Sequence, residues 1–215
     1  MTNRTDNFNR ADTTNNIGTP SDGGSAWSQL AGTWGISGNA GYMSSAGGSD
    51  RTCVLESSVA IVTVQATLSV APTEPYDSGL SIRAADSGNY IYSYIYPIGP
   101  DISHVIYKLI SGAYTELVYD ETPGTMANGD VITLSADSGN NITSTWNAFS
   151  VSANCSDGAT NTKHGIYLYA GNSNTRFDAF SITENSSGGG GGGSTRSYVP
   201  RVIGFGSPLA GNQLG

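Results

Sequence analysis

Short runs of alternating apolar and polar residues, separated by turn residues, recur along most of the chain. The clearest run is 59–70, where Val62, Val64, Ala66 and Leu68 alternate with polar positions. A period of two, rich in β-branched residues, is typical of a strand with one buried face. By the same criterion we predict strands at 51–57, 59–70, 79–85, 89–96, 103–110, 114–119, 131–136, 142–146, 148–152, 164–169 and 176–183.

Turn signals separate these runs, among them Gly38-Asn39, Ser111-Gly112 and Asn128-Gly129. Charged residues make up only 12% of the sequence, which argues against long surface helices. Many short strands at regular spacing predict an all-β sandwich or barrel.

A run of glycines at 188–193 follows the last predicted strand. We therefore predict a β domain over 1–185, a flexible linker over 186–194 and a C-terminal docking or anchor peptide over 195–215. An extended peptide of this kind can add a strand to a sheet edge, and a disordered end is the alternative. The residues expected to contact a partner are Tyr198, Val199, Arg201, Val202, Ile203 and Phe205.

The formal net charge is −8, which argues against non-specific nucleic-acid binding. We find no apolar run typical of a signal peptide or a membrane-spanning helix, so membrane insertion is not expected. Cys53 and Cys155 are the only cysteines. We expect both to stay reduced, with a disulfide between them as the alternative.

Alternating tyrosines mark the run 89–96: Tyr90, Tyr92, Tyr94 and Tyr96 all point to one face of that strand. Tyrosine rings can stack on sugar rings and offer a hydroxyl for hydrogen bonding. Contact with a neighbouring subunit and packing within the domain are the alternatives that the spacing leaves open.

Candidate catalytic groups are sparse. Glu116 and Glu121 are the nearest approach to a glycosidase acid pair, but a spacing of five places them on opposite faces of a regular strand. His104 and His164 show no nucleophile motif, and we expect both on strand surfaces. We therefore predict no catalytic residues and no enzyme activity.

The order of several motifs resembles the concanavalin-A-like (laminin-G-like) jelly-roll domains of bacteriophage virion proteins and bacterial surface proteins. These motifs are Asp-Asn-Phe-Asn-Arg-Ala-Asp at 6–12, Trp27, Gly-Thr-Trp at 32–34 and Arg-Phe-Asp-Ala-Phe-Ser-Ile-Thr at 176–183. The resemblance implies two antiparallel sheets with the first and last strands side by side. Such domains sometimes hold structural calcium, for which Asp6 and Asp178 are weak candidates; no other cofactor is expected.

The combined interpretation is a jelly-roll sandwich with a glycine-linked tail, acting as a virion structural protein on the particle surface. It would serve as a capsid decoration, head fibre or tail appendage. Other virion proteins and copies of the same chain would be its partners. The alternative is a lectin-like adhesion module, extracellular or on a cell surface, that recognises host polysaccharide.

Overall fold

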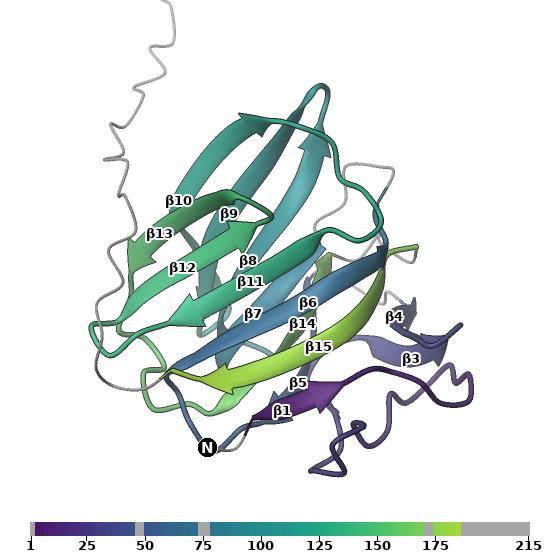
Figure 1. Ribbon diagram of the computed structural model, residues 1–215. Coiled ribbons are helices and arrows are strands. Elements are labelled where there is room, and N and C mark those ends of the chain that lie inside the picture. The colour runs from purple at the N-terminus through teal and green to yellow at the C-terminus, as the bar shows by residue number, and fades with distance from the viewer. Residues whose placement is uncertain (1–2, 46–49, 73–77, 170–173, 186–215) are drawn as a thin grey trace, which may run out of the picture.

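The computed structural model describes residues 3–45, 50–72, 78–169 and 174–185. These residues form two antiparallel sheets packed face to face, seen as two layers in Figure 1. The all-β sandwich prediction is confirmed, since no helix occurs within the described ranges. Accordingly, nothing in those ranges has the helical length and apolarity that crossing a membrane would need. The linker 186–194 and the tail 195–215 lie outside the described residues.

One sheet has eight strands. Its order is β13 (Phe149–Asn154), β12 (Asn141–Trp146), β11 (Val131–Ala136), β6 (Val62–Val70), β15 (Arg176–Glu184), β4 (Ala40–Ser45) and β3 (Thr33–Ser37), with β1 (Arg4–Asp6) paired to β15. β3 and β4 form a hairpin whose turn contains Gly38 and Asn39, both with positive φ. Here the turn residues supply the left-handed conformations that a tight hairpin requires.

The other sheet has seven strands. Its order is β10 (Ala113–Pro123), β9 (Asp101–Ile110), β8 (Asn89–Ile98), β7 (Ser78–Asp86), β14 (Lys163–Tyr169), β5 (Asp50–Glu56) and β2 (Ser28–Gln29). Short hairpins join β7 to β8, β8 to β9 and β9 to β10, so these four strands are neighbours in both sequence and space.

The main hydrophobic core fills the space between the sheets. In β6, Val62, Val64, Ala66 and Leu68 are fully buried while the residues between them are half-buried, as the alternation predicts. From the facing sheet, Ile91 and Ile95 of β8 belong to the same core. Alternate residues of a strand point to opposite sides of the sheet. Because Ile91 and Ile95 point into the core, the tyrosines of β8 lie on the outer side of the sheet.

The first strand closes the eight-stranded sheet beside the last one, as predicted. Arg4 pairs with Ile182 and Asp6 with Phe180, and Figure 1 shows β1 running along β15. The ring of Trp27 contacts two phenylalanine rings, at 4.8 Å from Phe180 of β15 and 5.9 Å from Phe8, which follows β1. The aromatic residues of the N- and C-terminal motifs therefore share one cluster.

The expectation that both histidines lie on strand surfaces is wrong. His104 is 2% exposed and His164 is fully buried. His104 Nε2 lies 2.7 Å from Ser144 Oγ, so β9 and β12 are hydrogen-bonded across the core. His164 Nδ1 accepts from the Arg83 amide at 3.2 Å, and its Nε2 donates to the Val59 carbonyl at 2.8 Å. Both ring nitrogens of His164 are thus hydrogen-bonded to backbone groups, whereas buried Nδ1 of His104 has no hydrogen-bond partner among the described residues. Strand periodicity alone does not reveal either environment.

Both cysteines are buried free thiols, as expected for the reduced state. Burial raises the pKa of the Cys53 thiol well above its ordinary value. The pKa of Cys155 is also raised by burial. Neither thiol is therefore activated as a nucleophile.

Candidate functional site: a tyrosine face on the seven-stranded sheet

Most of the twelve tyrosines in the sequence lie on the outer face of the seven-stranded sheet. We call this surface the tyrosine face. Its aromatic members are Tyr90, Tyr92, Tyr94, Tyr96, Tyr107, Tyr114, Tyr119, Tyr167 and Tyr169.

Strand register assembles this face from segments far apart in sequence. Tyr92 of β8 is directly opposite Tyr107 of β9, and Tyr94 is opposite Val105. On the other side of β8, Tyr94 pairs with Gly79 of β7, which in turn pairs with Tyr167 of β14. Since directly opposed residues share a face, all these side chains point the same way. Gly79 has no side chain, so the rings of Tyr94 and Tyr167 approach each other over it.

The central rings form an array of nearly parallel planes. Tyr92 lies 4.4 Å from Tyr167 and 5.8 Å from Tyr107, with interplanar angles of 29° and 23°. Tyr94 lies 5.9 Å from Tyr107 and 6.1 Å from Tyr167, at 16° and 24°. Aromatic pairs at such separations contribute about 0.5–1.5 kcal/mol beyond their buried area. The array is therefore well ordered before any ligand arrives.

The face has a buried floor and an accessible upper part. Tyr90 and Tyr92 are only 1% and 3% exposed, and they pack with Leu109 and Tyr167 in a second hydrophobic cluster outside the main core. Internal packing, one of the three alternatives, thus describes Tyr90 and Tyr92. Tyr94 and Tyr96 are half-buried, as are Tyr107 and Tyr119. Tyr114 and Tyr169 at the margins are 50% and 44% exposed.

Two carboxylates also belong to this face, contrary to the expectation that Glu116 and Glu121 lie on opposite sides of their strand. A β-bulge at Leu117 shifts the register, so that Glu116 pairs with Tyr107 and Glu121 with Ser103. A bulge adds one extra residue to one strand, so the five positions from Glu116 to Glu121 lie opposite only four positions of β9. The two glutamates therefore point to the same side of the sheet. Tyr107 donates a hydrogen bond to Glu116 Oε2 at 2.9 Å, and Tyr119 donates to Glu121.

These contacts change the acidity of the phenols. Burial and the hydrogen bond to Glu116 raise the pKa of Tyr107 to about 12. Burial and the hydrogen bond to Glu121 raise the pKa of Tyr119 to about 12 as well. Both phenols therefore stay neutral hydrogen-bond donors at neutral pH.

The two calcium candidates are engaged in protein contacts. Asp6 Oδ1 accepts from the Phe8 amide at 2.9 Å and from Arg10 at 2.8 Å, and Oδ2 accepts from Arg10 at 2.8 Å and Trp27 Nε1 at 2.7 Å. Asp178 accepts from the Ala179 amide at 2.7 Å. Among the described residues no group of three or more His, Cys, Asp and Glu side chains could hold a metal ion. Calcium at these positions stays a prediction.

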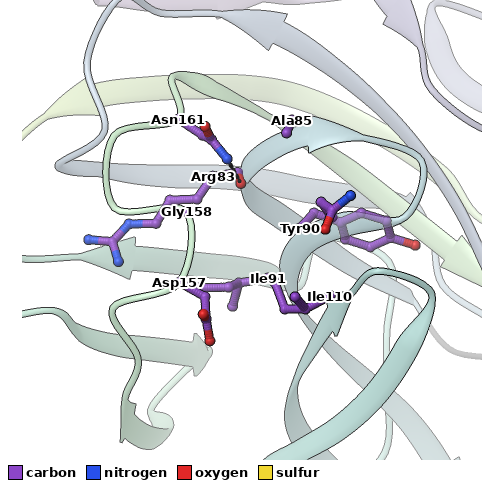
Figure 2. A pocket seen from close by; sticks show the side chains of 9 residues that line it. Arg83, Ala85, Tyr90, Ile91, Ile110, Asp157, Gly158 and Asn161 are labelled. Atoms are coloured by element: carbon purple, nitrogen blue, oxygen red, sulfur yellow. Dashed lines mark hydrogen bonds between the residues drawn. The ribbon is translucent and has the colours of Figure 1, made fainter.

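A small pocket lies at one end of the sandwich, between the β7–β8 hairpin and the loop 155–162. Its volume is about 240 Å³, below the roughly 300–1,000 Å³ of typical ligand pockets. Arg83 donates to the Cys155 carbonyl at 2.9 Å, and Asn161 donates to the Arg83 carbonyl at 3.2 Å. Arg83 is one of the lining residues, and Figure 2 shows its guanidinium pointing away from Tyr90 and Ile110.

Comparison with known proteins supports the fold. No family model matches the chain, and no curated protein sequence matches it. Among solved structures, the carbohydrate-binding module CBM66 from Bacillus subtilis has a TM-score of 0.52 at 15% identity, over 74% of this chain and 92% of that one. The CBM2 module of the evolved Dit of Lactobacillus casei BL23 phage J-1 has a TM-score of 0.51 at 10% identity, over 85% and 97%. A β-1,3-1,4-glucanase (lichenase) derived from a mouse hindgut metagenome has a TM-score of 0.51 at 10% identity, over 86% and 99%.

The protein therefore has the concanavalin-A-like jelly-roll fold that its motifs predict. Binding modules and glycosidases both occur among its structural neighbours. The fold therefore does not distinguish binding from hydrolysis, and the function must be inferred from the residues of the site.

Sequence reasoning found four of the tyrosines and missed the rest of the face. Tyr167 and Tyr169 alternate within the predicted strand 164–169, and this signal marks their shared orientation. Tyr107 stands alone in its strand and becomes recognisable only through its register with Tyr92. The bulge at Leu117 has no sequence signal beyond two consecutive apolar residues, Leu117 and Val118.

Proposed function

We propose that this chain is a carbohydrate-binding module whose ligand lies on the tyrosine face. The observation that carries the proposal is the array of nearly parallel tyrosine rings on the outer side of the seven-stranded sheet, in which Tyr94 and Tyr107 are half-buried and stack on each other. Two structural neighbours are described as carbohydrate-binding modules, which supports the same function.

The accessible rings supply the contact surface. Tyr94, Tyr96 and Tyr107 present apolar ring area on which the C–H faces of sugar rings can pack. The buried floor below them, Tyr92 and Tyr167, holds these rings in place, so little side-chain entropy is lost on binding. Glu116 and Glu121 accept hydrogen bonds, which gives sugar hydroxyls partners at the rim.

We expect Tyr94→Ala and Tyr96→Ala each to weaken glycan binding at least tenfold, about 1.4 kcal/mol. Each substitution removes a ring from the accessible part of the face and leaves the buried floor intact. A glycan array would identify the ligand, and calorimetric titration would measure the loss. Tyr42→Ala is the matched control, because Tyr42 lies in β4 of the other sheet. The proposal is wrong if no glycan binds, or if the Tyr94 and Tyr96 variants bind as tightly as the control.

We further propose that the module is displayed on the surface of a bacteriophage particle, as a capsid decoration, head fibre or tail appendage made in the host cytoplasm. The similarity to a module of a phage Dit protein supports this placement. The tail residues Tyr198, Val202, Ile203 and Phe205 would attach it to other virion proteins or to copies of itself. A cell-surface adhesin with the same glycan contact is the alternative.

Deleting residues 194–215 is expected to abolish self-association and leave glycan affinity unchanged. Light scattering during size-exclusion chromatography would give the mass of each form, and the control is deletion of 207–215 alone, which keeps the apolar tail residues. Equal masses for the full chain and the 194–215 deletion would contradict a role of the tail in oligomer formation.

We propose that binding occurs without catalysis. Glu116 and Glu121 pair with Tyr107 and Ser103, which are four residues apart on β9. At about 3.4 Å per residue this is a separation of roughly 14 Å along the strand. Glycosidase acid pairs lie about 5–10 Å apart.

A further inference from the structure

The rim of the tyrosine face is acidic. Glu116 and Glu121 are both exposed, and the bulge at Leu117 brings them to the same side of β10 as the tyrosines. Glu116 accepts a hydrogen bond from Tyr107, and Glu121 accepts one from Tyr119. Because both donors are neutral phenols, these hydrogen bonds do not neutralise the negative charge of the carboxylates. An ionised carboxylate has about four acceptor positions, so both retain capacity for another donor.

Around the half-buried rings, the described positions on this face carry no positive side chain. In the register of the seven-stranded sheet, the positions around Tyr92, Tyr94 and Tyr96 on the tyrosine face are Gly79, Ser81, Ser103, Val105, Tyr107, Glu116, Tyr119, Glu121, Gly165 and Tyr167. None of these described positions is Lys or Arg. Lys108 of β9 is on the opposite side of the sheet, where it forms an ion pair with Asp157 at 2.8 Å. Lys163 shares the outer side with Tyr167, but it begins β14 four residues away, opposite Glu56.

The geometry points to a preference for glycans that carry protonated amino groups; this inference rests on the proposed function of the tyrosine face. An oligosaccharide of a few rings lying along β8 and β9 passes both carboxylates. An ammonium group on a sugar replaces a hydroxyl donor by a charged one, and charge-assisted hydrogen bonds are about twice as strong as neutral ones. Anionic polysaccharides meet like charge at the same rim and are disfavoured.

The rim carboxylates act alongside the rings. Stacking on Tyr94 and Tyr96 holds any glycan of suitable shape, whether neutral or charged. Glu116 and Glu121 accept hydrogen bonds from sugar hydroxyls, and they add a charge-dependent gain in affinity only where the sugar bears an amine. The two contributions are separable by substitution, because the carboxylates extend from β10 and these rings from β8.

Glucosamine oligomers and N-acetylglucosamine oligomers of equal length provide a matched pair of probes, since acetylation removes the positive charge and keeps the ring. We expect the full chain to bind the glucosamine oligomer about three- to tenfold more tightly in low salt, at a pH where the amine is protonated. Added salt should reduce this ratio, because the carboxylates are solvent-exposed. A galacturonate oligomer should bind more weakly than either probe.

The double variant Glu116→Gln, Glu121→Gln should bring the ratio close to one, because the amide side chains keep a hydrogen-bond acceptor and lose the negative charge that favours the amine. Glu184→Gln in β15 of the other sheet is the control for the general negative charge of the protein, and it should keep the full ratio. Tyr94→Ala should weaken binding of both oligomers, which distinguishes the face from unspecific attraction.

Two results would overturn the inference. One is equal affinity of the full chain for the two oligomers, or no binding of either. The other is a ratio that survives in the double glutamine variant. If the N-acetylated oligomer binds in a Tyr94-dependent manner without any charge preference, the proposed glycan-binding function stands and the amino-sugar preference alone fails.

Discussion

The protein is expected to lose about 3 kcal/mol of unfolding free energy for each of two buried histidines as the pH falls from 6.5 to about 4. Burial lowers the pKa of both His104 and His164 to about 4, against an ordinary value of 6.5. Between these values the unfolded chain binds a proton that the folded chain does not, so unfolding becomes more favourable as the pH falls. A shift of one pKa unit corresponds to about 1.4 kcal/mol.

Burial is the main cause of the lowered pKa at both rings. His104 contacts the hydroxyl of Ser144, and burial is the cause of its lowered pKa. Around His164, the nearby Glu56 favours protonation and Arg83 opposes it, with burial as the largest effect. Since a domain is typically stable by only about 5–15 kcal/mol, the combined loss is a large part of the total.

Urea denaturation at pH 6.5, 5.5 and 4.5 would measure the slope of the unfolding free energy against pH. Each histidine should contribute up to about 1.4 kcal/mol per pH unit, and His104→Gln or His164→Gln should remove its share. Carboxyl groups act at lower pH: hydrogen bonds from Asn89 and Asn141 lower the pKa of Asp86 and Asp137, respectively, from an ordinary value of 3.8. A flat profile in the unmodified protein would show that the histidines do not titrate as described.

Asp6→Ala is expected to destabilise the fold by about 3–5 kcal/mol. The Asp6 carboxylate is fully buried and joins Arg10, Trp27 and the Phe8 amide through four hydrogen bonds. Its removal leaves the Arg10 guanidinium, whose side chain is only 24% exposed, without its ion-pair partner. Breaking a largely buried ion pair in this way typically costs about 3–5 kcal/mol.

Asp12→Ala is the matched control for that substitution. Asp12 is exposed and accepts a hydrogen bond from the Gly38 amide at 2.9 Å. Loss of one such bond should cost about 0.5–1.5 kcal/mol. Chemical denaturation of both variants would measure the difference, and equal losses would mean that the Asp6 network does not hold the N-terminal segment against the last strand.

The sequence by itself determined the all-β class, most strands from residue 51 onward and the shared orientation of Tyr90, Tyr92, Tyr94 and Tyr96. These properties depend on local periodicity: alternate residues of a strand face alternate sides, whatever the strand packs against. The two-sheet sandwich and the side-by-side placement of the first and last strands were implied by the resemblance to jelly-roll domains that the motifs at 6–12 and 176–183 carry.

Only the tertiary structure decided which tyrosines are accessible and what surrounds them. Tyr92 is buried because Tyr107 and Tyr167 arrive beside it from β9 and β14, and the pairing of distant strands cannot be read from periodicity. A regular strand would place Glu116 and Glu121 on opposite sides of the sheet, but the bulge at Leu117 shifts the register by one residue and places them on the same side. Burial of His104 likewise depends on β12, which follows it by some forty residues. Orientation along a strand is a local property, whereas register, burial and charge environment belong to pairs of strands and appear only when the chain is folded.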